Sequence, residues 1–84
     1  MQAPHEVKIQ FTEGVELEFS RIEVKSTTGQ RVNKGSIRRV AADTLAIDLL
    51  PLQPGDYIIE WRVLSVDTHI TEGILRFTVK ASGK

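Results

Sequence analysis

Hydrophobic and polar side chains alternate along most of this chain. The clearest run follows the turn signal Gln53-Pro54-Gly55 and places its large apolar side chains on one face: Tyr57, Ile59, Trp61 and Val63. A period of two over that length predicts a β-strand with one buried face. Because this strand carries the only Trp and the only Tyr of the chain, we expect it to form the centre of the core, with Trp61 buried.

Shorter alternating segments precede and follow that strand. They cover residues 6–11, 15–24, 45–49 and 75–79, and the weakly patterned segment 31–40 is interpreted as an irregular edge strand around residues 37–40. In 15–24 the alternation changes parity near Ser20, which a bulge, a change of sheet or two short segments joined by a bend would each explain. No window has a helical period, and Gly and Pro separate the segments. The pattern predicts a single all-β domain over residues 1–84, an antiparallel Greek-key β-sandwich or barrel of about six to seven short strands.

Composition narrows the classes of function. Lys plus Arg and Asp plus Glu number 11 each, so the formal net charge is zero and no basic excess favours nucleic acid or anionic lipid. No apolar run approaches the roughly 20 residues of a membrane span, so we expect no direct membrane insertion. The chain has no Cys, which excludes thiolate catalysis, disulfides and Cys-ligated zinc.

The candidate functional residues lie where the long alternating run ends, at Asp67-Thr68-His69. If the strand continues that far, the carboxylate and the imidazole point the same way, roughly 6–7 Å apart at Cα. Two side chains at that spacing can hold one metal ion. The alternative is an Asp that caps a turn beside an exposed His.

Two further interpretations follow from strand geometry. Ser65, Asp67 and His69 alternate along one line, whereas a hydrolase triad needs its base between nucleophile and acid; we therefore do not expect these residues to form a triad. His5 begins the first predicted strand, and the Asp-x-His pair ends the fifth. In an alternating antiparallel order these strands run the same way, which places His5 at the opposite pole as an exposed residue.

The remaining candidates have structural interpretations. Tyr57 and Trp61 fit the core rather than a stacking platform. Tyr57 follows Pro54-Gly55 as in a tyrosine corner, in which the hydroxyl bonds to backbone upstream of its own strand. The basic residues between 31 and 39 fit a solvated edge that discourages strand addition, rather than a phosphate site: Arg31, Lys34, Arg38 and Arg39.

These residues also resemble a known family. Residues 52–79 are similar to the C-terminal half of the CopC-type copper-resistance proteins, which are small periplasmic copper-binding β-sandwiches of immunoglobulin-like topology. The most distinctive stretch is Trp61-Arg62-x-x-Ser65-x-Asp67-x-His69, with Gly73-x-x-x-Phe77-x-Val79 after it. The N-terminal part of the chain also resembles the family, in Ala3-Pro4-His5-Glu6-Val7 and in Val15-x-Leu17-x-Phe19-Ser20. The resemblance covers nearly the whole chain and implies an immunoglobulin-like Greek-key fold.

Two departures limit what the resemblance implies about copper. In the family, a His at the start of an extra N-terminal segment, with its free amine, joins the Asp-x-His pair in ligating Cu(II), and this sequence starts after that segment. Some members bind Cu(I) through a Met-rich loop, whereas this chain has the single methionine Met1. We therefore expect copper, as Cu(II), to be held mainly by Asp67 and His69 and only weakly, with further ligands from outside this sequence.

The resemblance implies a non-enzymatic periplasmic domain of copper resistance or homeostasis, whose signal peptide is not present in this sequence. Its expected partners are the copper ion and a membrane copper transporter of CopD type. Without the family's first strand, the sheet with which it pairs exposes unpaired backbone groups, so we expect either a homodimer through an exposed edge strand or a register in which the first residues fill the gap. The alternative is an immunoglobulin-like interaction or structural module of the same fold that has lost high-affinity copper binding.

Overall fold

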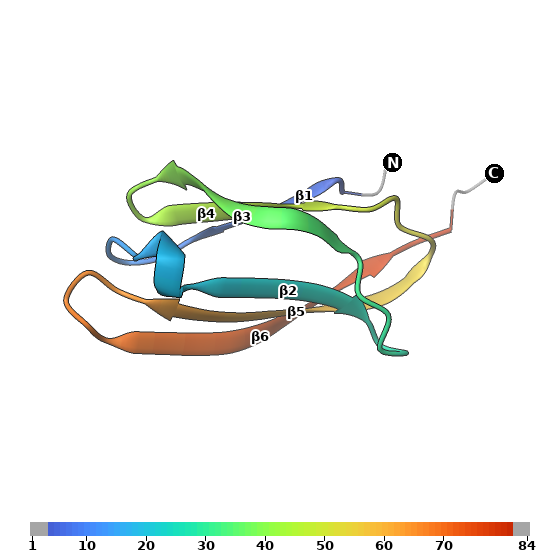
Figure 1. Ribbon diagram of the computed structural model, residues 1–84. Helices are drawn as coiled ribbons and strands as arrows, with labels where there is room; N and C mark the ends of the chain where they lie inside the picture. Colours follow the sequence, from blue (N-terminus) through green and yellow to red (C-terminus); the bar gives the residue numbers. More distant parts are fainter. Residues whose placement is uncertain (1–3, 82–84) are drawn as a thin grey trace.

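The computed structural model describes residues 4–81, which form two antiparallel three-stranded sheets that face each other (Figure 1). One sheet has the order β1-β4-β3, formed by Glu6–Gln10, Thr44–Leu49 and Asn33–Ala41. The other has the order β2-β5-β6, formed by Arg21–Ser26, Gly55–Leu64 and Ile70–Val79. A short 3-10 turn, η1 (Leu17–Phe19), precedes β2. The predicted all-β antiparallel sandwich is confirmed, and no helix within residues 4–81 is long and apolar enough to cross a membrane.

The chain changes sheet between β1 and β2. Residues 15–24 do not form one strand: Val15 makes an isolated bridge with Ser65, η1 follows, and β2 begins at Arg21. The Ser20 hydroxyl donates to the Glu16 carbonyl at 2.6 Å and holds this turn. Residues 14–16 already pair with residues 64–66 at the end of β5, so the parity break is the point where η1 interrupts the pairing of this segment with β5.

The edge strand β3 is irregular. It begins at Asn33, earlier than the expected segment 37–40, and its register with β4 shifts between Lys34 and Arg38 and again between Arg39 and Ala41. Gly35, inside the first irregularity, has a φ of +73°, a conformation that favours glycine. Bulges interrupt the strict alternation of inward and outward side chains, which explains why the sequence shows only a weak pattern here.

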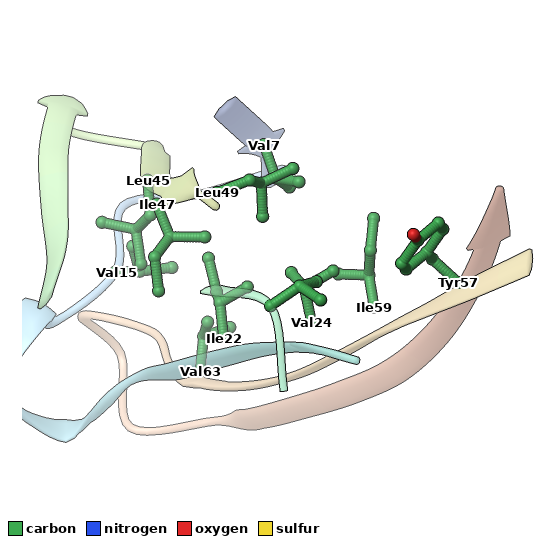
Figure 2. Packing of buried hydrophobic residues seen from close by; sticks show 11 residues of the cluster. Val7, Val15, Ile22, Val24, Leu45, Ile47, Leu49, Tyr57, Ile59 and Val63 are labelled. Carbon is green, nitrogen blue, oxygen red and sulfur yellow. The ribbon is translucent and has the colours of Figure 1, made fainter. Parts of the chain in front are cut away.

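The core lies between the two sheets and consists mainly of branched aliphatic side chains (Figure 2). Its most deeply buried members come from both layers: Val15, Val24, Leu45, Ile47 and Val63. β5 is the middle strand of its sheet, as expected. Trp61 is only half-buried, however, so the prediction of a buried Trp at the centre is wrong. Its cross-strand neighbour on the edge strand is Gly73, and the indole covers the space that a side chain would fill there.

Tyr57 anchors the other end of β5. Its hydroxyl donates to the Gln53 carbonyl at 2.6 Å, upstream of its own strand. Its ring stacks on Phe77 of β6, with centroids 5.2 Å apart and an interplanar angle of 18°. The expected tyrosine corner is confirmed, and it ties the connection before β5 to the core.

A substitution at Gly73 tests the position of the indole. A Cβ at this residue would lie 2.4 Å from Cζ2 and 2.5 Å from Cη2 of Trp61, so the ring would have to move. We expect Gly73→Ala to lower the free energy of unfolding by roughly 1–3 kcal/mol in urea denaturation, as overpacking does. The double variant Gly73→Ala/Trp61→Phe should recover part of this loss, because a smaller ring leaves room for the methyl group. An unchanged stability in Gly73→Ala would contradict the contact.

Candidate metal centre

The candidate ligands Asp67 and His69 lie in the turn between β5 and β6, because β5 ends at Leu64. The Thr68 N–H donates to the Ser65 carbonyl at 2.9 Å, and the Ser65 N–H donates to the His69 carbonyl at 2.8 Å. Thr68 has a φ of +72°, a left-handed conformation that is uncommon for a β-branched residue. The turn brings the two side chains together, with Nδ1 of His69 3.4 Å from Oδ1 of Asp67. They converge as expected, but through a turn rather than along a strand.

Ser65 positions this turn from within the core. It is the buried polar residue at the end of the strand, 5% exposed. Its hydroxyl donates to Oδ1 of Asp67 and accepts the backbone N–H of His69 at 3.1 Å. The hydroxyl therefore bonds to one candidate ligand through its carboxylate and to the other through its backbone, and it holds the turn that carries both.

Glu13 joins the pair from the connection after β1. One carboxylate oxygen of Glu13, one of Asp67 and one ring nitrogen of His69 all lie within 4.8 Å of one another, and all three residues are exposed. Neighbouring backbone bonds fix this approach: the Val66 N–H donates to the Gly14 carbonyl at 2.9 Å, next to the bridge between Val15 and Ser65. The cluster combines two oxygen donors and one nitrogen donor.

Glu13 was not among the candidate ligands predicted from the sequence, although the polarity of the strands places it near them. β1 and β5 run in the same direction, so the end of β1 and the end of β5 lie at the same pole (Figure 1). The strand directions that separate His5 from His69 therefore also bring the turn Thr12-Glu13-Gly14 beside the Asp-x-His turn. Glu13 was missed because only histidine was considered as a further partner for Asp67 and His69.

His5 and the basic residues lie apart from the cluster. The His5 carbonyl accepts the Leu49 N–H at 2.9 Å at the start of β1, the opposite pole from the β5–β6 turn (Figure 1). Arg31 pairs with Glu23 at 2.8 Å, and Arg38 pairs with Asp48 at 3.0 Å and with Glu6. Arg39 donates to the carbonyls of residues 15 and 42. These guanidinium groups are engaged across the edge of the sheet and do not converge on a phosphate site.

The electrostatics of the cluster centre on Asp67. The hydrogen bond from the Ser65 hydroxyl lowers the pKa of Asp67 below its ordinary value of 3.8, and the nearby His69 acts in the same direction. Partial desolvation opposes this shift. Asp67 is therefore a carboxylate at neutral pH, available as an anionic oxygen donor.

The fold defines a class of small antiparallel β-sandwiches built from two three-stranded sheets. The chain resembles the solved structure of CopC from Methylosinus trichosporium OB3b with a TM-score of 0.81 and 38% identity, over 94% of this chain and 78% of that one. It also matches the family model of the CopC domain over residues 1–80. The chain therefore belongs to the CopC domain family.

Named relatives connect the family with copper handling. Copper resistance protein C of Escherichia coli is 31% identical over 93% of this chain and 69% of its own length. Copper transport protein CutJ of Bacillus subtilis is 35% identical over 96% of this chain, which corresponds to 16% of CutJ. Protein YobA of Escherichia coli K12 is 33% identical over 93% of this chain, and this chain spans 65% of the length of YobA.

Removing the Ser65 hydroxyl tests its effect on Asp67. Because the folded-state pKa is lowered, the carboxylate stabilises the fold above pH 3.8, and this contribution is lost as the pH falls through the folded pKa. We expect Ser65→Ala to raise the pKa of Asp67 in an NMR titration of the metal-free protein. The pKa of Asp43, which hydrogen bonds from Gln10 and Thr44 lower, should stay unchanged as an internal control. An unmoved Asp67 titration would show that the hydroxyl is not its main partner.

Proposed function

We propose that this chain is a non-enzymatic copper-handling domain that binds Cu(II) at Asp67 and His69, with Glu13 as a third ligand. The observation that carries the proposal is the convergence of two carboxylates and one imidazole, with donor atoms within 4.8 Å of one another. Oxygen and nitrogen donors suit the tetragonal geometry of Cu(II). Two carboxylates this close also repel each other, and a cation between them relieves that repulsion. Membership of the CopC family supports copper as the ion.

Copper should be held weakly by these residues alone. Cu(II) prefers four strong equatorial ligands, whereas the cluster offers three donor groups. At least one position then falls to water, buffer or a neighbouring molecule. All three residues are exposed, so a ligand from another molecule can reach the ion directly. A weakly held and open ion suits transfer to a partner better than permanent storage.

We further propose a periplasmic location and exchange of copper with a membrane transporter of CopD type. CutJ supports this, because a segment similar to this chain makes up 16% of that copper transport protein. Self-association through an exposed edge strand is proposed for the same domain.

One observation favours the alternative, an immunoglobulin-like interaction module that has lost copper. The Ser65 hydroxyl already bonds to both Asp67 and the His69 backbone. These bonds account for the turn geometry without any metal. The two functions differ in one measurable property, since only the copper-handling domain needs the His69 imidazole.

A Cu(II) titration followed by EPR separates the two functions. We expect wild type to show a spectrum with nitrogen and oxygen ligation, and His69→Ala, Asp67→Asn and Glu13→Gln each to weaken binding by at least about tenfold. Cu(II) should outcompete Zn(II). Binding should fade as the pH falls, because only a neutral imidazole ligates copper.

His5→Ala is the matched control for this titration, since it removes the other imidazole from the opposite pole. It should bind copper like wild type. If His69→Ala also binds like wild type, the proposed site is wrong, and if His5→Ala alone abolishes binding, copper is held at the start of β1. No binding by wild type would favour the interaction module.

A further inference from the structure

The sheet edges of this molecule differ in how they are protected. The edge of β3 carries bulges and engaged arginines. The edge of β2 is partly covered, because the Val32 N–H donates to the Val24 carbonyl at 2.9 Å and the Asn33 side chain accepts the Val24 N–H at 3.0 Å. β1 is short, with 5 residues. β6 has 10 residues in unbroken register with β5, and its free side has no strand beside it within residues 4–81.

β6 also exposes apolar side chains, of which Ile70 is 56%, Ile74 63% and Leu75 50% exposed. It has no Pro and no bulge along its length. Proteins usually block such a long, regular and apolar edge, because it is a template for pairing with another strand. β6 is therefore the edge of this domain that is best suited to pair with another strand.

The hydrogen-bond phase of the β5–β6 pair determines which backbone groups face outward. The Ser65 N–H donates to the His69 carbonyl, and Leu64 lies opposite Ile70. Odd-numbered residues of β6 therefore bond to β5, and even-numbered residues direct their N–H and C=O groups to the free side. Their side chains share the outer face of the sheet: Ile70, Glu72, Ile74, Arg76 and Thr78.

We propose that two copies of this chain associate by antiparallel pairing of β6 with β6, with Ile74 on the two-fold axis. In this register Ile74 faces Ile74 of the second copy, and Glu72 faces Arg76 of the second copy at both ends. Glu72 lies opposite Arg62 of β5 in its own sheet, but neither Glu72 nor Arg76 forms an ion pair within the described part of the chain. Opposite charges placed directly across strands stabilise a pair, and like charges destabilise it.

The charges select this register over its neighbours. A two-fold axis at Glu72 would place this carboxylate opposite itself, and an axis at Arg76 would place two guanidinium groups opposite each other. An axis at Gly73 or Leu75 leaves both charges without an opposite charge across the interface. Only the axis at Ile74 pairs both charges and joins the exposed isoleucines, so the occupant that best fits this edge is a second copy of the same edge.

The inner face of the sheet agrees with the same register. Gly73 lies opposite Leu75 of the second copy, and the indole of Trp61 covers Gly73. Leu75 of each copy then packs beside Trp61 of the other, which covers two side chains that are partly exposed in the single chain. The metal cluster lies in the turn before β6, so the two clusters come to opposite ends of the dimer and stay open. The proposal does not depend on copper.

Sedimentation of the metal-free protein over a wide concentration range, in EDTA, tests the interface. We expect wild type to dimerise. Glu72→Arg and Arg76→Glu should each raise the dimer dissociation constant by about tenfold or more, because each places like charges opposite each other twice. The double variant Glu72→Arg/Arg76→Glu should return to within about threefold of wild type. Lys34→Glu, which changes the net charge as Arg76→Glu does but on the β3 edge, should leave dimerisation unchanged.

Two further readouts locate the interface. Ile74→Lys brings two ammonium groups together on the axis and should give a monomer with an unchanged fold by circular dichroism, since Ile74 is exposed. Trp61 fluorescence should shift to shorter wavelength as wild type dimerises and should not shift in Ile74→Lys. A wild type that stays monomeric at millimolar concentration, a double variant as weak as the single variants, or a dimer with unshifted fluorescence would each overturn the proposal.

Discussion

The candidate site depends on the backbone pairing of residues 14–16 with residues 64–66. The Val66 N–H donates to the Gly14 carbonyl at 2.9 Å, and the Glu16 N–H donates to the Leu64 carbonyl at 2.8 Å. Between them Val15 is 2% exposed and anchors the segment in the core. The burial of the Val15 side chain and the backbone hydrogen bonds on either side of it hold the same short segment in place. Val15 could not leave the core without carrying Glu13 away from the Asp-x-His turn, so hydrophobic packing determines the geometry of a polar cluster.

Local patterns in the sequence predicted the elements whose geometry is regular. Strict alternation located β5, and Pro54-Gly55 before Tyr57 located the tyrosine corner. Only the part of β3 around residues 37–40 was predicted, because bulges interrupt the period of two along this strand. Trp61 was misplaced because size suggested the centre of the core, whereas its depth depends on Gly73, a residue that is distant in sequence and identified as its neighbour only by the register. Glu13 was missed because its partners come from another part of the chain.

The cluster combines a firm support with exposed donors. Ser65 is buried and bonds to both the Asp67 carboxylate and the His69 backbone, so the turn is held from inside the core. The donor atoms themselves face water. Desolvating a carboxylate pair would cost several kcal/mol without a bound cation, and exposure avoids that cost in the metal-free state. The same exposure lowers the strength of any metal bond, because water competes for each position. The arrangement therefore supports the proposal of reversible rather than tight binding.

The edge strand β6 also carries exposed groups, which the proposed dimer would cover. Glycine weakens a strand interior because it has no side chain to pack, and Gly73 leaves its space to the indole of Trp61. In the symmetric pair, Leu75 of the second copy covers that indole from outside on the inner face. On the outer face, the same register places Glu72 opposite Arg76. Covering the Trp61 indole and pairing Glu72 with Arg76 are independent requirements, and they apply to opposite faces of the sheet. Because a single register meets both, the self-complementarity of β6 does not rest on the charges alone.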